Sequence, residues 1–253
     1  MTELEVCIDS VEGAKAASRY GATRVELCAN LNEGGTTPSA GMIAMVHEAL
    51  ATTRTTELYV MIRPRGGNFV YSQDELSVMK RDIQMARQLG ADGVVLGCLT
   101  EGATTCIDVP VTKSLVQLAH PLPVTFHRAF DRTNNPTSME AMLEAVIQTG
   151  AKRILTSGLA PSVEQGTATL KKLTNLAEGR IAIMAGCGVR PDNVKLLVKT
   201  TNVQAVHFTA RRKVLSRQEF NNIPMGASAE DDIQYEVDHE KMEAIRQALQ
   251  ELS

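Results

Sequence analysis

The stretches GATRVELC (21–28), GADGVVLG (90–97) and GAKRILTSG (150–158) share one pattern, in which Gly-Ala and a polar pair lead into a short apolar run. Each follows a segment with helical periodicity: VEGAKAASRY, LSVMKRDIQMARQL and SMEAMLEAVIQT, respectively. A glycine that ends a helix in the left-handed conformation, directly before a strand, is typical of the αβ junction of a parallel α/β fold. The stretches begin at 21, 90 and 150, so intervals of 69 and 60 residues leave room for one further βα unit in each.

Five more apolar runs supply the strands that this spacing requires. They are LEVCID (4–9), ELYVMIR (57–63), PVTFHR (123–128), IAIMAG (181–186) and AVHFTA (205–210). Eight strands that alternate with helices in about 250 residues predict an α/β fold of the (β/α)8 TIM-barrel type, as a single domain over 1–253. An open doubly wound sheet also alternates, but no G-x-G-x-x-G follows the first strand, so we favour the barrel.

Two segments lack this regularity. Residues 29–41, ANLNEGGTTPSAG, predict a long loop after the second strand, on the side where barrel sites are built. Residues 221–238 predict a polar, flexible connection that leads into a final helix over 239–252, with Asp238 as its N-cap.

Composition and charge limit the function. The net charge of −3 and the pI near 6.0 argue against a nucleic-acid-binding protein, which would need a basic surface. No apolar run approaches the roughly 20 residues that span a bilayer, so we expect no membrane association. The start MTELEV is acidic and enters a strand at once, which indicates that no signal peptide is present. Five cysteines, an odd number without framework spacing, favour free thiols in the cytoplasm.

Two adjacent strands carry the same polar motif. Residues 5–9 read E-x-C-x-D and residues 26–30 read E-x-C-x-N. If Leu4, Val6 and Ile8 face the helices, then the polar residues point into the barrel. Neighbouring strands lie about 4.8 Å apart, so Cys7 and Cys28 would approach one another. A soft thiolate pair suits Cu(I), whereas buried free cysteines also simply pack as small hydrophobic residues, so both interpretations stay open.

Basic residues cluster where the third strand ends. Arg63 shares the inward phase of Tyr59 and Met61, and Arg65 follows just before Gly66-Gly67. Two arginines beside a glycine turn suit a carboxylate or a phosphate group. Alternatively, Arg63 pairs with Glu5 or Glu26, because a buried charge requires compensation.

Further candidates lie at the ends of the later strands, where barrel enzymes place their catalytic residues. His127 is predicted to point inward, with Arg128 directly after it, and His207 lies in the eighth strand. The turns after the sixth and seventh strands add Ser157, Gly186 and Gly188, which precede helices and would suit an anion. For a catalytic function the candidates are His127, Glu26 and Asp9. For binding an anionic ligand they are Arg63, Arg65, Arg128, Asn30, Ser157, Gly186, Gly188 and His207.

The motifs together resemble those of the CutC copper-homeostasis family. They are EVCIDS, VELCANLNEGGTTPS, VMIRPRGGNF, DGVVLG, TFHRAFD, RILTSG and IMAGCGV, in matching order over about four-fifths of the chain. The resemblance implies a cytoplasmic TIM barrel with a role in copper tolerance, in which Cys7 and Cys28 match the positions proposed to bind Cu(I). It also favours a homodimer. Two positions depart from the family pattern, namely Cys187 where glycine or alanine is usual, and HFTA (207–210) where small hydroxyl residues usually follow the histidine.

Two functions therefore remain open. The first is a copper-handling protein that holds Cu(I) between Cys7 and Cys28. The second is a barrel enzyme that acts on a small phosphorylated or carboxylated metabolite, because Glu5, Asp9, Glu26, Arg63, Arg65 and His127 exceed what a two-sulfur copper site requires.

Overall fold

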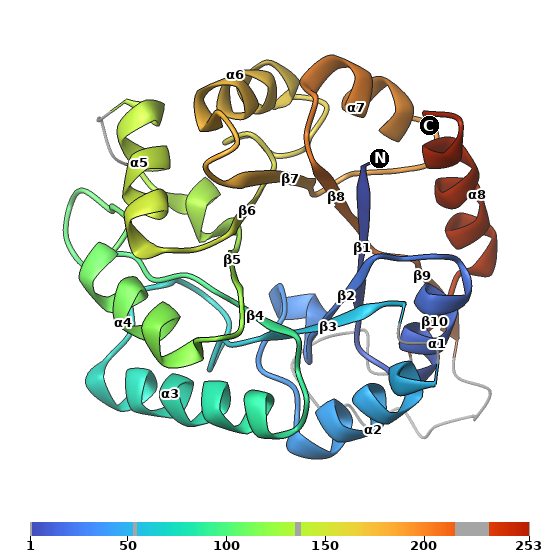
Figure 1. Ribbon diagram of the computed structural model, residues 1–253, viewed down its shortest axis with the longest axis horizontal. Coiled ribbons are helices and arrows are strands. Elements are labelled where there is room, and N and C mark those ends of the chain that lie inside the picture. Colours follow the sequence, from blue (N-terminus) through green and yellow to red (C-terminus); the bar gives the residue numbers. More distant parts are fainter. Residues whose placement is uncertain (1, 53–54, 135–137, 216–232, 253) are drawn as a thin grey trace.

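Eight parallel strands close into a barrel in the computed structural model, which describes residues 2–52, 55–134, 138–215 and 233–252. The strands form one ring and the helices surround it (Figure 1), so the predicted TIM barrel is confirmed. The barrel strands are β1 (Glu3–Ile8), β2 (Arg24–Leu27), β3 (Glu57–Met61), β4 (Gly93–Leu96), β5 (Val124–Phe126), β6 (Arg153–Thr156), β7 (Ala182–Gly186) and β8 (Ala205–Phe208).

The outer helices begin at side-chain caps that the sequence supplies. Ser10, Ser39, Ser72, Asp108 and Ser138 each accept a hydrogen bond from a backbone N–H in the first turn of the helix that follows. The described helices are α1 (Val11–Arg19), α2 (Ala40–Ala51), α3 (Gln73–Gln88), α4 (Val109–Ala119), α5 (Met139–Thr149), α6 (Thr167–Ala177), α7 (Val194–Thr201) and α8 (His239–Gln250), with the short 3-10 turns η1 (Leu31–Glu33) and η2 (Arg128–Arg132).

The junctions before β2, β4 and β6 have the predicted glycine conformation. Gly21, Gly90 and Gly150 have φ values of 76°, 87° and 89°, in the left-handed region. Gly150 caps α5 directly, and its N–H donates to the carbonyl of Ile147. The repeated Gly-Ala pattern therefore marks the points where each helix ends and the chain returns to the sheet.

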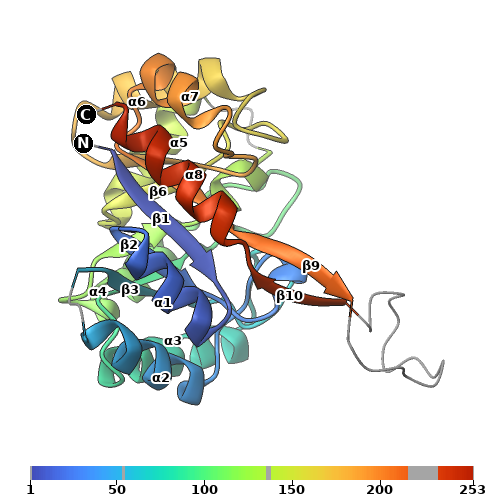
Figure 2. The same cartoon turned by 90° about the vertical axis from the view of Figure 1, so that its right-hand side faces the viewer.

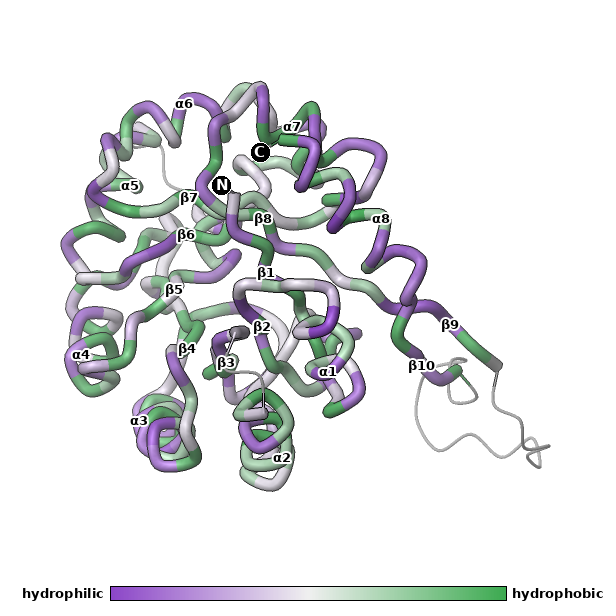
Figure 3. The backbone as a smooth tube through the Cα atoms, turned by 45° about the vertical axis from the view of Figure 1, so that its right-hand side comes forward, coloured by the Kyte–Doolittle hydropathy of each residue, from purple (hydrophilic) through white to green (hydrophobic). Residues whose placement is uncertain are grey.

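Alternating strand residues separate an apolar outer layer from a polar interior. Leu4, Val6 and Ile8 belong to the large hydrophobic core between the strands and the helices, as predicted. Cys7, Cys28, Tyr59, Met61 and Val95 form a separate cluster inside the barrel. Hydrophobic stretches accordingly follow the barrel wall, whereas the chain is hydrophilic where β9 begins (Figure 3).

A hairpin extends the fold beyond the barrel. Strands β9 (Arg211–Leu215) and β10 (Ile233–Val237) pair antiparallel and project away from the barrel beside α8 (Figure 2). The prediction of an irregular connection over 221–238 is therefore wrong for residues 233–237, which pair with β9, and its part over 221–232 lies outside the described residues. Asp238 caps α8 as predicted, since its side chain accepts from the N–H of Lys241.

The N-terminal ends of the strands enclose a layer of paired charges. The Arg24 side chain is only 2% exposed and contacts the carboxylates of Glu3 at 2.8 Å and Glu5 at 3.5 Å. Arg153 contacts Glu3 at 3.3 Å and donates to Thr125 Oγ1 at 3.1 Å. Both guanidinium groups lie over the ring of Tyr59. This layer compensates its own buried charge and closes one end of the barrel interior.

Candidate functional site

The two inward thiols lie directly above this charged layer and are close to each other. The Sγ atoms of Cys7 and Cys28 are 4.0 Å apart, and both residues are buried. Strand pairing aligns Cys7 with Glu26, so Cys28 lies two residues further along β2 and reaches Cys7 diagonally. The E-x-C repeat on neighbouring strands therefore places two sulfur atoms in one small space, as the sequence predicts.

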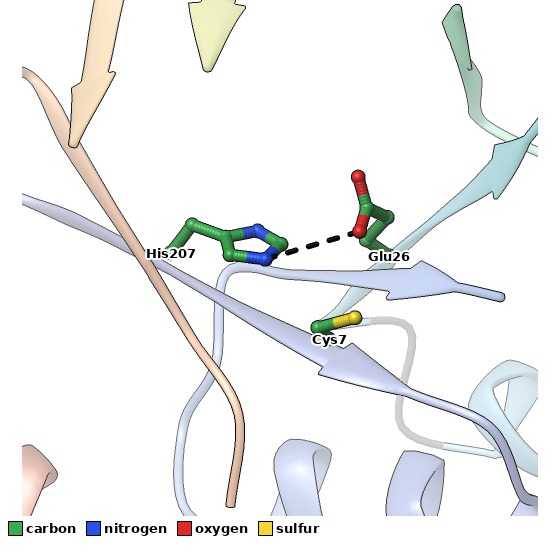
Figure 4. A group of neighbouring side chains, drawn as sticks. All are labelled: Cys7, Glu26 and His207. Atoms are coloured by element: carbon green, nitrogen blue, oxygen red, sulfur yellow. Dashed lines mark ion pairs between the residues drawn. The ribbon is translucent and has the colours of Figure 1, made fainter. Parts of the chain in front are cut away.

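Glu26 and His207 form a compact group with Cys7 (Figure 4). One ligand atom from each of the three residues lies within 4.8 Å of the others. The Cys28 thiol donates to Glu26 Oε2 at 3.5 Å, and His207 Nε2 is 3.8 Å from the same oxygen. On its other side, His207 Nδ1 donates to Glu5 Oε1 at 2.8 Å. Three donor groups thus converge from strands β1, β2 and β8, and Cys28 lies beside them just after β2.

The proximity of these side chains lowers the pKa of Cys7 and raises those of Cys28 and Glu26. The hydrogen bond from Cys28 lowers the pKa of Cys7 to about 5, against the effect of burial. The same hydrogen bond, together with burial, raises the pKa of Cys28 well above its ordinary value. Burial likewise raises the pKa of Glu26, helped by the nearby charge of Cys7. The pair thus favours one thiolate at Cys7 that is held by a thiol at Cys28.

Glu5 and His207 form the charged pair beneath these groups. Burial raises the pKa of Glu5, but the hydrogen bond and the charge of His207 and the charges of Arg24 and Arg153 bring it below its ordinary value. Burial opposes protonation of His207, yet the Glu26 charge and the hydrogen bonds to Cys7 and Glu5 raise its pKa well above the ordinary range. His207 therefore favours the protonated state in this arrangement.

A cavity of about 440 Å³ opens above the thiols at the C-terminal ends of the strands. Cys7, Glu26 and His207 line its floor, and His127 and Arg128 lie at its wall. Of the other predicted residues, Arg63 and Gly188 also line this cavity, whereas Asp9, Asn30, Arg65, Ser157 and Gly186 do not. Only some of the predicted site residues therefore line the same cavity.

His127 is buried and is one of the residues that line the cavity. Its Nδ1 accepts from the Ala129 N–H at 3.3 Å, so the proton of the neutral ring lies on Nε2. Nε2 has no hydrogen-bond partner among the described residues. Burial, with the charge of Arg63, lowers the pKa of His127 to about 3. A ring that stays neutral near pH 7 suits binding of an acceptor better than acceptance of a proton.

Arg128 is held beside the cavity by the turn after β6. It contacts Asp131 Oδ2 at 2.9 Å and donates to Ser157 Oγ at 3.1 Å, while its side chain remains 40% exposed. Asp131 also accepts from the backbone N–H groups of Ser157 and Leu159. Ser157 thus positions Arg128 rather than lining the cavity itself.

The two arginines after β3 make structural contacts. Arg63 pairs with neither Glu5 nor Glu26; its guanidinium donates to the backbone carbonyls of Glu33, Gly35 and Gly67, each at 2.9 Å. It thereby fastens the 29–41 loop across the cavity mouth. Arg65 forms an ion pair with Glu75 at the start of α3 and lies over the ring of Tyr71. Most N–H groups of Arg63 and Arg65 are therefore already bonded to groups of the same chain.

Asp9 and Asn30 leave the inward phase that the motif predicts. Asp9 pairs with Arg211 at 2.8 Å and lines a second cavity, of about 420 Å³, between β1, the hairpin and α8. Asn30 is exposed and has a left-handed φ of 50°, because β2 ends at Leu27 and the chain turns into η1. The inward direction predicted for Asn30 is therefore wrong.

The glycines after β7 make room for the site. A Cβ on Gly186 would lie 2.5 Å from Leu155 Cδ1 and 3.2 Å from His207 Cβ, so only glycine leaves space for the imidazole beside it. Cys187 and Gly188 follow with φ values of 82° and 84°. Residues 189–193 separate this turn from α7, so the glycines precede the helix but do not lead directly into its N-terminus.

Fold and site together describe a TIM-barrel protein with a buried cysteine pair, one member of which lines a cavity at the C-terminal ends of the strands. Residues 2–212 match the CutC family. A Bacteroides fragilis family protein CutC is 51% identical over 88% of this chain and 87% of its own length, and the human copper homeostasis protein cutC homolog is 44% identical over 89% and 80%. A crystal structure of CutC from Streptococcus agalactiae aligns with a TM-score of 0.76 and 35% identity, covering 82% of this chain and 98% of that one.

The chain therefore belongs to the CutC family. The resemblance inferred from the motifs is confirmed. No helix in the described ranges has both the length and the apolar character needed to cross a bilayer.

Proposed function

We propose that this protein binds Cu(I) between the sulfur atoms of Cys7 and Cys28 and contributes to copper homeostasis in the cytoplasm. The observation that carries the proposal is the 4.0 Å separation of the Sγ atoms of these two residues, of which Cys7 lines the cavity and Cys28 lies behind it. Metal–thiolate bonds are about 2.3 Å long for zinc, so one ion could reach both sulfurs with little movement. Soft thiolate ligands select Cu(I) among the common metals.

The surroundings support a thiolate site. The hydrogen bond from Cys28 lowers the pKa of Cys7 to about 5, so one ligand is already deprotonated near neutral pH. Gly35 of the 29–41 loop packs against the Cys28 side chain, which shields the sulfur from solvent. All five cysteines are free, as a reducing compartment requires. Relatives at 44–45% identity carry the name copper homeostasis protein.

The test is an anaerobic Cu(I) titration against a competing chelator. We expect the wild type to bind one Cu(I) tightly, and the double variant Cys7→Ser/Cys28→Ser to lose that binding. Cys98→Ser is the matched control, because Cys98 is equally buried but lies in the outer hydrophobic core. Wild-type affinity in the double variant would exclude the cysteine pair as the copper site.

A second candidate function is that of a barrel enzyme acting on a small phosphorylated or carboxylated metabolite. The observation that favours it is that His127 lines the cavity next to the half-exposed Arg128, and that His127 Nε2 has no hydrogen-bond partner among the described residues. A carboxylate or phosphate oxygen would accept from both groups.

Thermal unfolding in the presence of such metabolites tests this candidate, since a ligand that binds the native state raises its stability. We expect a rise in the unfolding temperature that is lost in His127→Phe and Arg128→Met. Arg132→Met serves as the control, because Arg132 is nearby but does not line the cavity. No rise for any phosphorylated or carboxylated compound would count against an anion-binding cavity.

A further inference from the structure

We propose that Cys7, Glu26 and His207 form a three-ligand site for a divalent ion of the zinc type, with a fourth, open position towards the cavity. The inference concerns the cavity floor to which Cu(I) binding was assigned and partly rests on that proposal, but it adds two ligands and a second class of metal. Two sulfurs suffice for Cu(I), whereas sulfur, imidazole and carboxylate together are the ligands of Zn²⁺.

The distances between the three donor atoms are close to those of a tetrahedral site. Bonds of about 2.0–2.3 Å to nitrogen, oxygen and sulfur place neighbouring ligand atoms roughly 3.3–3.8 Å apart. The structure has 3.8 Å between Glu26 Oε2 and His207 Nε2. One donor atom from each of Cys7, Glu26 and His207 lies within 4.8 Å of the other two, so shifts of about 1 Å or less would bring all three to one ion.

The outer contact of His207 orients the ring for metal binding. Its Nδ1 donates to Glu5 Oε1 at 2.8 Å, so Nε2 is the nitrogen that faces the other donors. A carboxylate that holds the far nitrogen of a histidine is the usual support of a zinc ligand, because it fixes the ring and raises its basicity. Arg24 in turn holds Glu5, so the support is anchored in the charged layer below.

Glu26 supplies an independent sign that a ligand belongs here. The residue is 2% exposed, and its Oε1 has no hydrogen-bond partner among the described residues. A buried carboxylate oxygen without a partner is costly, and a two-sulfur copper site offers it none. A cation between Cys7, Glu26 and His207 would bring the carboxylate into coordination.

The site also has a route for the ion. Cys7, Glu26 and His207 line the 440 Å³ cavity, whereas Cys28 lies behind Cys7 under the 29–41 loop. An ion that enters from the cavity therefore reaches all three ligands directly.

The experiment uses the metal-free full chain with Co²⁺ as a spectroscopic probe, followed by Zn²⁺ competition. We expect one Co²⁺ per chain, with the intense visible absorption of a four-coordinate site and a sulfur-to-metal charge-transfer band. Glu26→Gln and His207→Gln should each weaken binding by at least about tenfold, which is the loss that even outer-shell changes produce. Cys98→Ser should bind as the wild type does.

Weak absorption typical of six-coordinate Co²⁺ in the wild type, or unchanged affinity in both Glu26→Gln and His207→Gln, would overturn the inference. Denaturant unfolding of each metal-free variant checks that a loss reflects a missing ligand rather than a missing fold. The Cu(I) titration is scored separately. Tight Cu(I) without Co²⁺ or Zn²⁺ binding leaves the copper proposal and removes this one, and the reverse result removes the copper proposal alone.

Discussion

The barrel interior contains two polar layers that are arranged differently. In the layer at the N-terminal ends of the strands, Arg24 and Arg153 face the carboxylates of Glu3 and Glu5 and the ring of Tyr59. In the layer above, Glu26, His127 and His207 line a cavity. Opposite charges that pack against one another close one end of the barrel, whereas polar groups that border a cavity leave room for a ligand.

Glu5 connects the two layers. It contacts Arg24 on one side and His207 on the other, because β1 lies between β2 and β8 in the closed ring. The orientation of His207 in the upper layer therefore depends on Glu5, which is held by the charged lower layer. Damage to the lower layer should appear first as lost stability, and damage to the upper layer first as lost binding.

The largest expected effect is that of Arg24→Met, which leaves Glu5 buried without its guanidinium partner. Removal of one member of a buried ion pair costs about 3–5 kcal/mol, since the remaining charge is uncompensated. Urea denaturation at neutral pH measures the loss. Arg19→Met, on the exposed face of α1, should change the free energy of unfolding by no more than about 0.5 kcal/mol. Equal effects of the two substitutions would show that the lower layer is not the structural one.

Much of this arrangement could be predicted from the sequence, because it depends on period-2 alternation and on the glycine junctions. The strands, their inward phase and the approach of Cys7 to Cys28 follow from the pattern alone. The partner of Glu5 could not be predicted, because it depends on register between strands. Arg24 shares the inward phase of Glu26, but the alternation alone does not distinguish it from Arg63 as the partner of Glu5.

Other errors arose where a strand ends. Asn30 would point inward if β2 continued, but Leu27 is the last strand residue and the chain turns into the 29–41 loop. Residues 233–237 contain only three apolar side chains and form a strand because β9 pairs with them. The separation of Asp9 from the central cavity likewise depends on Arg211, which the hairpin provides.

A smaller effect is expected for Gly186→Ala, which tests the upper layer by steric means. The new methyl group would lie 2.5 Å from Leu155 Cδ1 and would push on His207. Overpacking of this kind costs about 1–3 kcal/mol, measured by urea denaturation. Gly41→Ala is the matched control, because a Cβ there meets nothing closer than Ser39 Oγ at 4.0 Å, and it should cause no loss of stability. A tolerated Gly186→Ala would mean that His207 is less confined than the contacts indicate.

The pH dependence of stability tests whether His127 is held neutral. Its pKa is lowered to about 3 from an ordinary 6.5, so between these values the unfolded chain binds the proton and the folded chain does not. The contribution of His127 is therefore fully present above pH 6.5 and is lost as the pH falls, with a slope of up to about 1.4 kcal/mol per pH unit. Urea denaturation from pH 4 to 7 measures this contribution. The free energy of unfolding of His127→Gln should change less steeply with pH than that of the wild type, by up to about 1.4 kcal/mol per pH unit. An unchanged slope would contradict a neutral, buried imidazole at the cavity wall.

The smallest expected effect concerns Cys187, where this chain departs from the family pattern. Its φ of 82° lies in the left-handed region, where a residue with a Cβ is strained by about 1–2 kcal/mol and glycine is not. Cys187→Gly should therefore raise the free energy of unfolding by about 1 kcal/mol, partly offset by the loss of its Sγ contact with the Pro161 carbonyl. Cys106→Gly, at a residue outside the left-handed region, should lower stability instead, because glycine there only adds freedom to the unfolded chain. Since Cys187 lines the cavity wall, a Cys187→Gly variant that gains stability but loses ligand binding would place it in the upper layer, and one that keeps binding would confine its role to the turn.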